Sequence, residues 1–212
     1  MNICFVFFCD KRYEVGLNKL LKSLEKYNFD KILLSNDIKN NSFDKIIKYE
    51  NLESKCHIDK LKSVFSKIEI FNIKNYDRII YFDSDMLCIG DISYLFSEEL
   101  NMYDICGVKG KDGRLNAGMM VINKSIFDFN PFDECMKIYN KYKILYLADQ
   151  TIINIFLKNE KIKIGYLSDE YNFSDKEVVE NNWKSSRIIH FIKNKPWISP
   201  KGEIGNYWLN YG

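Results

Sequence analysis

Apolar and polar residues alternate along the chain in blocks that predict strands and helices in turn. Residues 3–8 (ICFVFF) are continuously apolar, which is typical of a strand buried on both faces of a parallel sheet. Across residues 13–27 the leucines recur at helical spacing, so a helix is expected to follow that strand. Short apolar runs at 31–35 and 46–47 predict further strands. The chain therefore opens with the βα pattern of a sheet that is covered by helices.

The same patterns continue along the chain, although its last part is irregular. Residues 58–73 have helical spacing and lead into the strongly apolar run 78–82. The remaining expected elements are strands at 104–108, 115–123, 162–167 and 187–192, and helices at 92–96, 131–147 and 149–157. Residues 195–208 mix glycine, proline and aromatic residues without periodicity. We predict an α/β fold with a mixed, mainly parallel central sheet flanked by helices.

Length and composition indicate one soluble globular domain. The 212 residues are enough for a sizeable core, so the whole of 1–212 is expected to form a single domain. The net charge is only +2 and the lysines are scattered, which gives no reason to expect a nucleic-acid partner. No apolar run reaches membrane length, so we expect no integral membrane segment and a cytoplasmic location. The six cysteines form no CxxC pair, so reduced core thiols are expected rather than disulfides.

The candidate chemistry begins where the run 78–82 ends in Asp83, Ser84 and Asp85. Residues i and i+2 of an extended segment point to the same side, so the two carboxylates can converge on one point. They repel each other unless a cation lies between them, and oxygen ligands suit hard ions such as Mg²⁺ or Mn²⁺. Alone the motif is weak evidence, because Asp-x-Asp also occurs by chance in loops or as a cap. Its place after a buried strand favours the metal site.

Three further motifs each allow a structural and a functional interpretation. The run 116–118 (NAG) opens a predicted strand, where the glycine permits either a β-bulge or the close approach of a ligand. Asp149 and Gln150 fall in the first turn of a predicted helix, where aspartate is a common cap. His190 lies near a strand end, and such a histidine is more often a hydrogen-bonded core residue than a ligand. The other histidine, His57, is expected at the surface.

The order of these motifs along the chain carries more information than any one of them. The motifs are the helix start with Tyr13 and Gly16, Lys67, Asp83-Ser84-Asp85, Asn116-Ala117-Gly118, Asp149-Gln150, and His190 followed by Lys195-Pro196-Trp197. Together they resemble glycosyltransferase family 8, the glycogenin-like and lipopolysaccharide galactosyltransferase-like enzymes, over about residues 5–197. The resemblance implies a single Rossmann-like GT-A domain. In such a domain 1–115 mainly binds the nucleotide, and 116–212 mainly forms the donor-sugar and acceptor half with a metal-binding tail.

The resemblance also implies an activity and a cofactor. The expected reaction is metal-dependent transfer of a hexose, glucose or galactose by family frequency, from a UDP-sugar to a hydroxyl group. The acceptor, whether a glycan, a protein or a small molecule, is not identified by the sequence, and a homodimer is left open. Asp83, Asp85 and His190 match the family's ligands for Mn²⁺, with Mg²⁺ as the alternative ion. Lys195 matches the family's phosphate-contacting lysine.

The remaining donor-binding residues are assigned by the same resemblance. The full set that matches the family is Phe8, Cys9, Asp10, Tyr13, Lys67, Asp83, Ser84, Asp85, Asn116, Ala117, Gly118, Asp149, Gln150, His190 and Lys195. The first four match the uridine-binding strand end, although a core role is an equal alternative for Phe8. Asn116 matches a binder of sugar hydroxyls, and Lys67 matches a basic residue that faces the donor. An exposed helix lysine is the alternative for Lys67.

Asp149, Gln150 and Lys195 are the expected catalytic residues. In this family transfer is expected to retain the anomeric configuration, which requires a covalent intermediate or a front-face route. Gln150 is too poor a nucleophile for the first route, and in relatives the equivalent of Asp149 mainly binds the sugar. We therefore expect a front-face reaction in which the metal and Lys195 stabilise the charge on the leaving group.

Two departures and two alternatives accompany this interpretation. Residues 192–194 replace a shorter glycine-containing link of many relatives, and the region between 91 and 116 is short. One alternative is a haloacid-dehalogenase-type phosphatase with Asp83 as nucleophile and Asp85 as acid. Against it, that motif normally lies on the first strand, and Met86 replaces its usual threonine. The other alternative is a catalytically inactive nucleotide-sugar-binding protein.

Overall fold

A computed structural model describes residues 1–50, 52, 63–142, 148–179 and 182–211. The strands are β1 (Ile3–Phe8), β2 (Asp30–Leu34), β3 (Lys45–Ile47), β4 (Arg78–Asp83), β5 (Met86–Cys88), β6 (Ile105–Lys109), β7 (Leu115–Asn123), β8 (Ile164–Leu167), β9 (Phe173–Ser174) and β10 (Ile188–His190). The α-helices are α1 (Glu14–Ser23), α2 (Pro131–Lys141), α3 (Ala148–Asn159) and α4 (Gly202–Asn210). Short 3₁₀ helices connect many of them, including η3 (Ser63–Asn72) and η7 (Asp169–Asn172).

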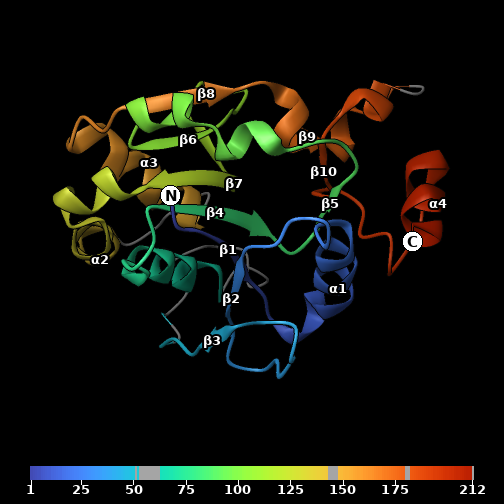
Figure 1. The fold of residues 1–212 in the computed structure, drawn as a ribbon, viewed down its shortest axis with the longest axis horizontal. Helices are drawn as coiled ribbons and strands as arrows, with labels where there is room; N and C mark the ends of the chain where they lie inside the picture. Colours follow the sequence, from blue (N-terminus) through green and yellow to red (C-terminus); the bar gives the residue numbers. More distant parts are fainter. Residues whose placement is uncertain (51, 53–62, 143–147, 180–181, 212) are drawn as a thin grey trace.

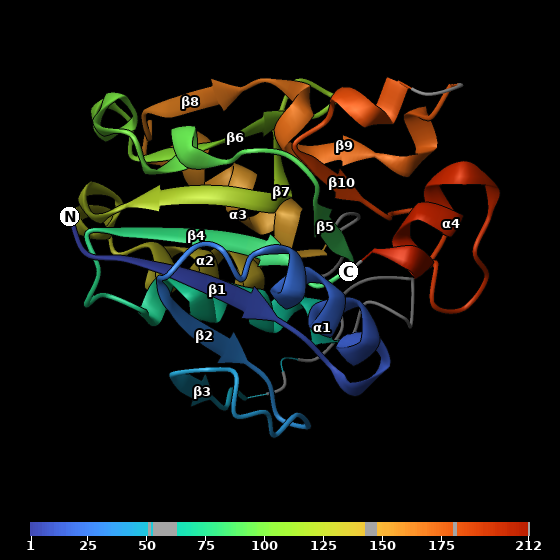
Figure 2. The same cartoon turned by 45° about the vertical axis from the view of Figure 1, so that its right-hand side comes forward.

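The described strands form a large sheet and a small one. The seven-stranded sheet has the order β3-β2-β1-β4-β7-β6-β8, and the three-stranded sheet has the order β5-β10-β9. In Figures 1 and 2 the small sheet lies beside the end of the large one, with α1 and α4 on that side. The pairs β4–β7 and β6–β7 are antiparallel and the other pairs of the large sheet are parallel. The predicted α/β fold with a mixed, mainly parallel central sheet is confirmed.

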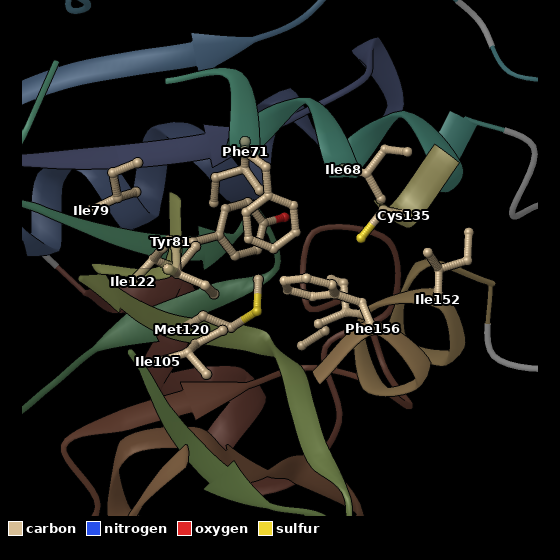
Figure 3. Close-up of a cluster of buried hydrophobic side chains, with 14 of the residues drawn as sticks. Ile68, Phe71, Ile79, Tyr81, Ile105, Met120, Ile122, Cys135, Ile152 and Phe156 are labelled. Atoms are coloured by element: carbon tan, nitrogen blue, oxygen red, sulfur yellow. The ribbon is translucent and has the colours of Figure 1, made fainter. Parts of the chain in front are cut away.

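Side-chain alternation along the central strands explains why both faces of the large sheet are buried. Ile79 and Tyr81 of β4 belong to a core layer shared with α2, α3 and η3, whereas Ile80 and Phe82 pack in a layer shared with α1. Figure 3 shows Tyr81 in the first layer, together with Phe156 of α3. Burial on both faces accounts for the continuously apolar strand sequences. The two layers pack against the strands that carry the candidate site.

The topology places a switch point at the carboxyl ends of β1 and β4. β1 pairs in parallel with β2 on one side and β4 on the other, so successive crossovers run in opposite directions from this point. Ligands of open α/β sheets bind at such a switch point. Phe8 is the register partner of Asp83 there, so the ends of both strands reach the same edge of the sheet.

The strands of the large sheet match the expected ranges, whereas several elements outside it were not expected. The strands β5 and β9 and the helix α4 were not expected. β5 and β9 are very short, and α4 follows a proline closely and contains two glycines, which are poor helix formers. The expected helix at 131–147 ends at Lys141 in the described residues, and that at 58–73 is observed only as η3. His57 lies outside the described residues. No helix in the described part of the chain is long and apolar enough to span a membrane.

The cysteines agree with the expectation of reduced core thiols. The five that fall within the described residues are buried and form no disulfide: Cys4, Cys9, Cys88, Cys106 and Cys135. Burial raises the pKa of Cys9 to about 12, so its thiol stays protonated and unreactive at neutral pH.

Candidate active site

The candidate metal ligands come from β4, the turn after it, and β10. β5 begins directly after Asp85, and antiparallel pairing of β10 with β5 sets His190 opposite Met86. His190 Nε2 lies 3.1 Å from Asp85 Oδ1 and 3.8 Å from Asp83 Oδ2. One ligand atom from each of the three residues lies within 4.8 Å of the others. The structure therefore brings together all three residues that the sequence suggested as ligands.

Lys195 adds a positive charge to this cluster. Its Nζ lies 2.5 Å from Asp85 Oδ2 and also donates to the carbonyl oxygen of Phe191 at 2.5 Å. Burial alone would raise the pKa of Asp85, but His190 and Lys195 outweigh it and hold that pKa well below its usual value. Asp85 is consequently ionised at neutral pH, as a metal ligand must be.

Lys67 lies on the other side of Asp83 and is buried rather than exposed. Its Nζ is 2.9 Å from Asp83 Oδ1 and 2.8 Å from Asp149 Oδ2, and its exposed fraction is 4%. Burial would lower the pKa of Lys67, but the two carboxylates outweigh it and raise that pKa. Tyr81 donates its hydroxyl hydrogen to Asp83 Oδ1 at 2.5 Å. The alternative of an exposed helix lysine is thus wrong, because Lys67 is the shared cation of two carboxylates.

Asp149 and Gln150 contact the site from the start of α3. Asp149 is 5% exposed and pairs with Lys67, so its carboxylate has a partner in the site besides any capping contact in the first turn of the helix. Burial raises the pKa of Asp149, and Lys67 opposes that rise. Gln150 Oε1 accepts a hydrogen bond from the backbone N–H of Ala117 at 3.2 Å. These contacts tie the first turn of α3 to the start of β7.

The run 116–118 shows the irregularity of a bulge, and the group that approaches its glycine is a side chain of the protein itself. The approach of a ligand stays a prediction. The register between β6 and β7 is irregular here, since Gly107 pairs with Met120 and Lys109 with Leu115. This irregularity leaves residues 116–118 outside the regular ladder, as in a bulge. Asn116 Oδ1 accepts a hydrogen bond from the backbone N–H of Gly118 at 2.8 Å. A Cβ atom on Gly118 would lie 2.5 Å from His190 Cε1, so the glycine also allows His190 to approach.

We expect Gly118→Ala to displace the His190 ring and to weaken Mn²⁺ binding by about 10- to 100-fold, as changes around metal ligands commonly do. Titration followed by electron paramagnetic resonance measures the free ion directly. Gly110→Ala is the matched control, because its Cβ would meet only the side chain of Asp112 and a backbone oxygen at 3.1 Å and 3.4 Å. Equal Mn²⁺ affinity in the two variants would contradict this role of Gly118.

The residues assigned to uridine lie at the ends of β1 and of the following 3₁₀ turn. The backbone oxygen of Phe8 accepts a hydrogen bond from Ser84 Oγ at 2.5 Å, which joins the ends of β1 and β4. Cys9 is 1% exposed, so its side chain is part of the core. The Asp10 carboxylate pairs with Arg12 at 2.6 Å. The Tyr13 ring faces the cluster, since Lys195 Nζ is 5.6 Å from its centroid.

Asn172 and Asp175 contact the site although the sequence gave no reason to select them. The Asn172 side chain bonds His190 Nδ1 and Asn116 Oδ1, each at 2.9 Å. The Asp175 carboxylate accepts from the backbone N–H groups of Lys193 and Asn194, each at 2.8 Å, and so holds the segment that leads to Lys195. The parallel pairing of β9 with β10 brings both residues to the site, and no local sequence pattern predicts that pairing.

The cluster fits a divalent ion chemically. Two carboxylates and one imidazole, one of the carboxylates held ionised, are a ligand set that Mn²⁺ accepts. The ring nitrogen of His190 that faces away from the carboxylates is hydrogen-bonded, as is usual for histidine ligands.

Comparison with known proteins identifies the family. The sequence profile described as glycosyl transferase family 8 matches residues 1–200. The chain belongs to glycosyl transferase family 8. Among its relatives, glycosyltransferase GlyB of Streptococcus pneumoniae serotype 4 is 26% identical over 168 residues, which cover 70% of this chain and 42% of GlyB.

Solved structures of glycosyltransferases share the fold of this family 8 chain. The crystal structure of glycosyltransferase GlyE of Streptococcus pneumoniae has a TM-score of 0.75 at 23% identity and aligns with 100% of this chain and 60% of GlyE. Galactosyltransferase LgtC, solved with donor and acceptor sugar analogs, has a TM-score of 0.67 at 17% identity, with 92% of this chain and 89% of LgtC covered. The chain therefore spans less than two thirds of the length of GlyB and of GlyE. Family membership sets aside the haloacid-dehalogenase-type phosphatase, whose motif would also lie on the first strand rather than on β4.

Proposed function

We propose that this family 8 chain transfers glucose or galactose from a UDP-sugar to a hydroxyl acceptor in a metal-dependent reaction. The observation that supports it most is the convergence of Asp83, Asp85 and His190, with Lys195 at 2.5 Å from Asp85. Residues so far apart in sequence form one charged cluster at the switch point of the sheet, where ligands of open α/β sheets bind. The name of the similar LgtC, a galactosyltransferase, agrees with a hexose donor.

In this proposal Asp83, Asp85 and His190 hold Mn²⁺ or Mg²⁺, which supplies Lewis-acid assistance to the departure of UDP. Lys195 stabilises the same leaving group, since its ammonium lies beside Asp85 and would adjoin the negative charge that develops on the diphosphate. Residues 1–115 mainly bind the nucleotide, and 116–212 mainly bind the donor sugar and the acceptor.

Retention by a front-face route is the proposed stereochemistry. The bond from the anomeric carbon to the diphosphate breaks, the acceptor oxygen bonds to that carbon on the same face, and the acceptor proton passes to the departing phosphate oxygen. A covalent route would require a free carboxylate nucleophile. Asp149 is a buried carboxylate beside the proposed metal ligands. Its Oδ2 lies 2.8 Å from Lys67 Nζ, so its charge is already neutralised by an ion pair. This engagement favours the front-face route over a glycosyl-enzyme intermediate.

Calorimetric titration with UDP-glucose, UDP-galactose and GDP-mannose tests the proposal. We expect one UDP-sugar to bind with Mn²⁺ present and binding to disappear with a chelator, because the diphosphate is held through the ion. When an accepting sugar is found, ¹H NMR of the fresh product should show the same anomeric configuration as the donor. GDP-mannose is the control for recognition of the base.

Three results would contradict this function. If a chelator did not change the affinity for UDP-sugars, the donor would not be bound through a metal ion. Binding without turnover, measured as release of UDP in water or with any acceptor, would support the alternative of an inactive nucleotide-sugar-binding protein. A product with the opposite anomeric configuration to the donor would contradict the front-face mechanism but not the assignment of the donor.

A further inference from the structure

We propose that Asn172 is a positioning residue that orients both His190 and Asn116, and so couples the metal centre to the donor-sugar site. This proposal rests on the function proposed above. Asn172 ends η7, immediately before β9, and only 8% of it is exposed. Its amide lies between the two side chains, 2.9 Å from His190 Nδ1 and 2.9 Å from Asn116 Oδ1. One short side chain therefore contacts a proposed metal ligand and a proposed sugar ligand at once.

The backbone N–H of Gly118 fixes the donor and the acceptor in each hydrogen bond that links Gly118, Asn116, Asn172 and His190. The N–H of Gly118 can only donate, so the atom of Asn116 that lies 2.8 Å from it is the carbonyl oxygen Oδ1. Because Oδ1 is an acceptor, the end of the Asn172 amide that faces it is the NH₂ group. The other end of Asn172 is then its carbonyl oxygen, which faces His190 Nδ1. That oxygen can only accept, so Nδ1 carries a hydrogen.

This direction prepares His190 to ligate a metal. With the Nδ1 hydrogen fixed by Asn172, the nitrogen available for coordination is Nε2, which lies 3.1 Å from Asp85 Oδ1. Histidine ligands to metals usually donate their second ring N–H to a fixed acceptor, which orients the ring and strengthens the ligand. Because Gly118 has no Cβ atom, the same ring can also lie against β7. Asn172 thus fixes which ring nitrogen of His190 is directed toward the carboxylates.

The same direction determines what Asn116 can recognise. Its Oδ1 accepts from both Gly118 and Asn172, whereas no acceptor for its Nδ2 is found among the residues that the structure describes. Asn116 therefore offers hydrogen-bond donors to a ligand, and a sugar hydroxyl next to it would be bound through its oxygen. Loss of Asn172 would leave the Asn116 amide held by the Gly118 N–H alone, and the looser amide would recognise the hydroxyl less well.

Two variants separate the two contacts. Asn172→Ala removes both, so Mn²⁺ affinity, measured by electron paramagnetic resonance, should fall about 10- to 100-fold. Asn172→Asp keeps an acceptor for His190 Nδ1 but has no hydrogen to donate to Asn116 Oδ1. Its Mn²⁺ affinity should stay at least equal to the wild type, while binding of the UDP-sugar relative to UDP should weaken in both variants. Asn206→Ala, an exposed amide on α4, is the matched control and should change neither quantity.

A measurement on the metal-free chain is independent of the proposed activity. The sequence has only two histidines, so the His57→Gln background leaves His190 as the sole imidazole signal in ¹H–¹⁵N spectra. We expect a slowly exchanging Nδ1–H resonance that disappears in Asn172→Ala and persists in Asn172→Asp. If the wild type binds no Mn²⁺ but shows this resonance, the proposed function fails and the positioning role stands. Absence of the protected Nδ1–H in the wild type, or unchanged Mn²⁺ affinity in Asn172→Ala, overturns the role of Asn172.

Discussion

Replacing Asp85 with asparagine is expected to lower kcat/KM for sugar transfer by about a thousandfold or more, since loss of metal assistance removes several kcal/mol of transition-state stabilisation. Asparagine has the same shape but lacks the charge that a divalent ion and Lys195 both require. The Asp85 carboxylate contacts His190 at 3.1 Å and Lys195 at 2.5 Å, so one substitution disturbs both groups that are proposed to stabilise the leaving diphosphate. Steady-state release of UDP, measured over a range of Mn²⁺ concentrations, gives the effect.

The control for Asp85→Asn is Asp133→Asn, which removes the same charge from an exposed position in the first turn of α2. That variant should keep wild-type activity. Both variants should keep the wild-type circular dichroism spectrum, because asparagine fits the space of aspartate. Activity of Asp85→Asn within tenfold of the wild type would mean that the cluster of Asp83, Asp85 and His190 is not the metal site.

The centre of the large sheet could be predicted from the sequence because its central strands are buried on both faces. A strand such as β1 reads ICFVFF without interruption, and few other structures tolerate such a run in a soluble domain. The small sheet gave no comparable signal, since β5 and β9 have only three and two residues. Their pairing is fixed by β10, which joins the site from far along the chain. Patterns read over a local window do not contain that information.

The candidate site divides in the same way. Asp83 and Asp85 could be selected locally, because two carboxylates at spacing i, i+2 after a buried strand have a clear chemical use. His190 and Lys195 could be selected only from the order of motifs known from the family. The burial of Lys67 between two carboxylates could not be foreseen, because a lysine at this helical position was equally expected to face solvent. Asn172 was missed altogether. Its importance follows from its contacts with His190 and Asn116, which lie far from it in the sequence and are brought together only by the fold.

Lys67→Met is the second substitution for which we expect a large effect, here on folding as well as on activity. The change leaves Asp83 and Asp149 without the cation that lies 2.9 Å and 2.8 Å from them. Breaking a buried ion pair in this way typically costs about 3–5 kcal/mol, because the remaining charge is buried without compensation. Urea unfolding monitored by circular dichroism should show a lower midpoint with an unchanged slope. Lys158→Met, at an exposed position of α3, should leave the midpoint nearly unchanged.

The double variant Lys67→Met/Asp149→Asn separates the buried charge from the packing of the lysine stem. Asp149 is 5% exposed, so its uncompensated charge is expected to account for a large share of the loss in Lys67→Met. Neutralising it should restore about half or more of the lost stability, which a double-mutant cycle would report as a favourable coupling between the two residues. Activity should stay low in the double variant, since the proposed donor site has then lost both groups. Additive losses of stability would instead assign the effect to packing around Tyr81, whose ring centroid lies 5.1 Å from Lys67 Nζ.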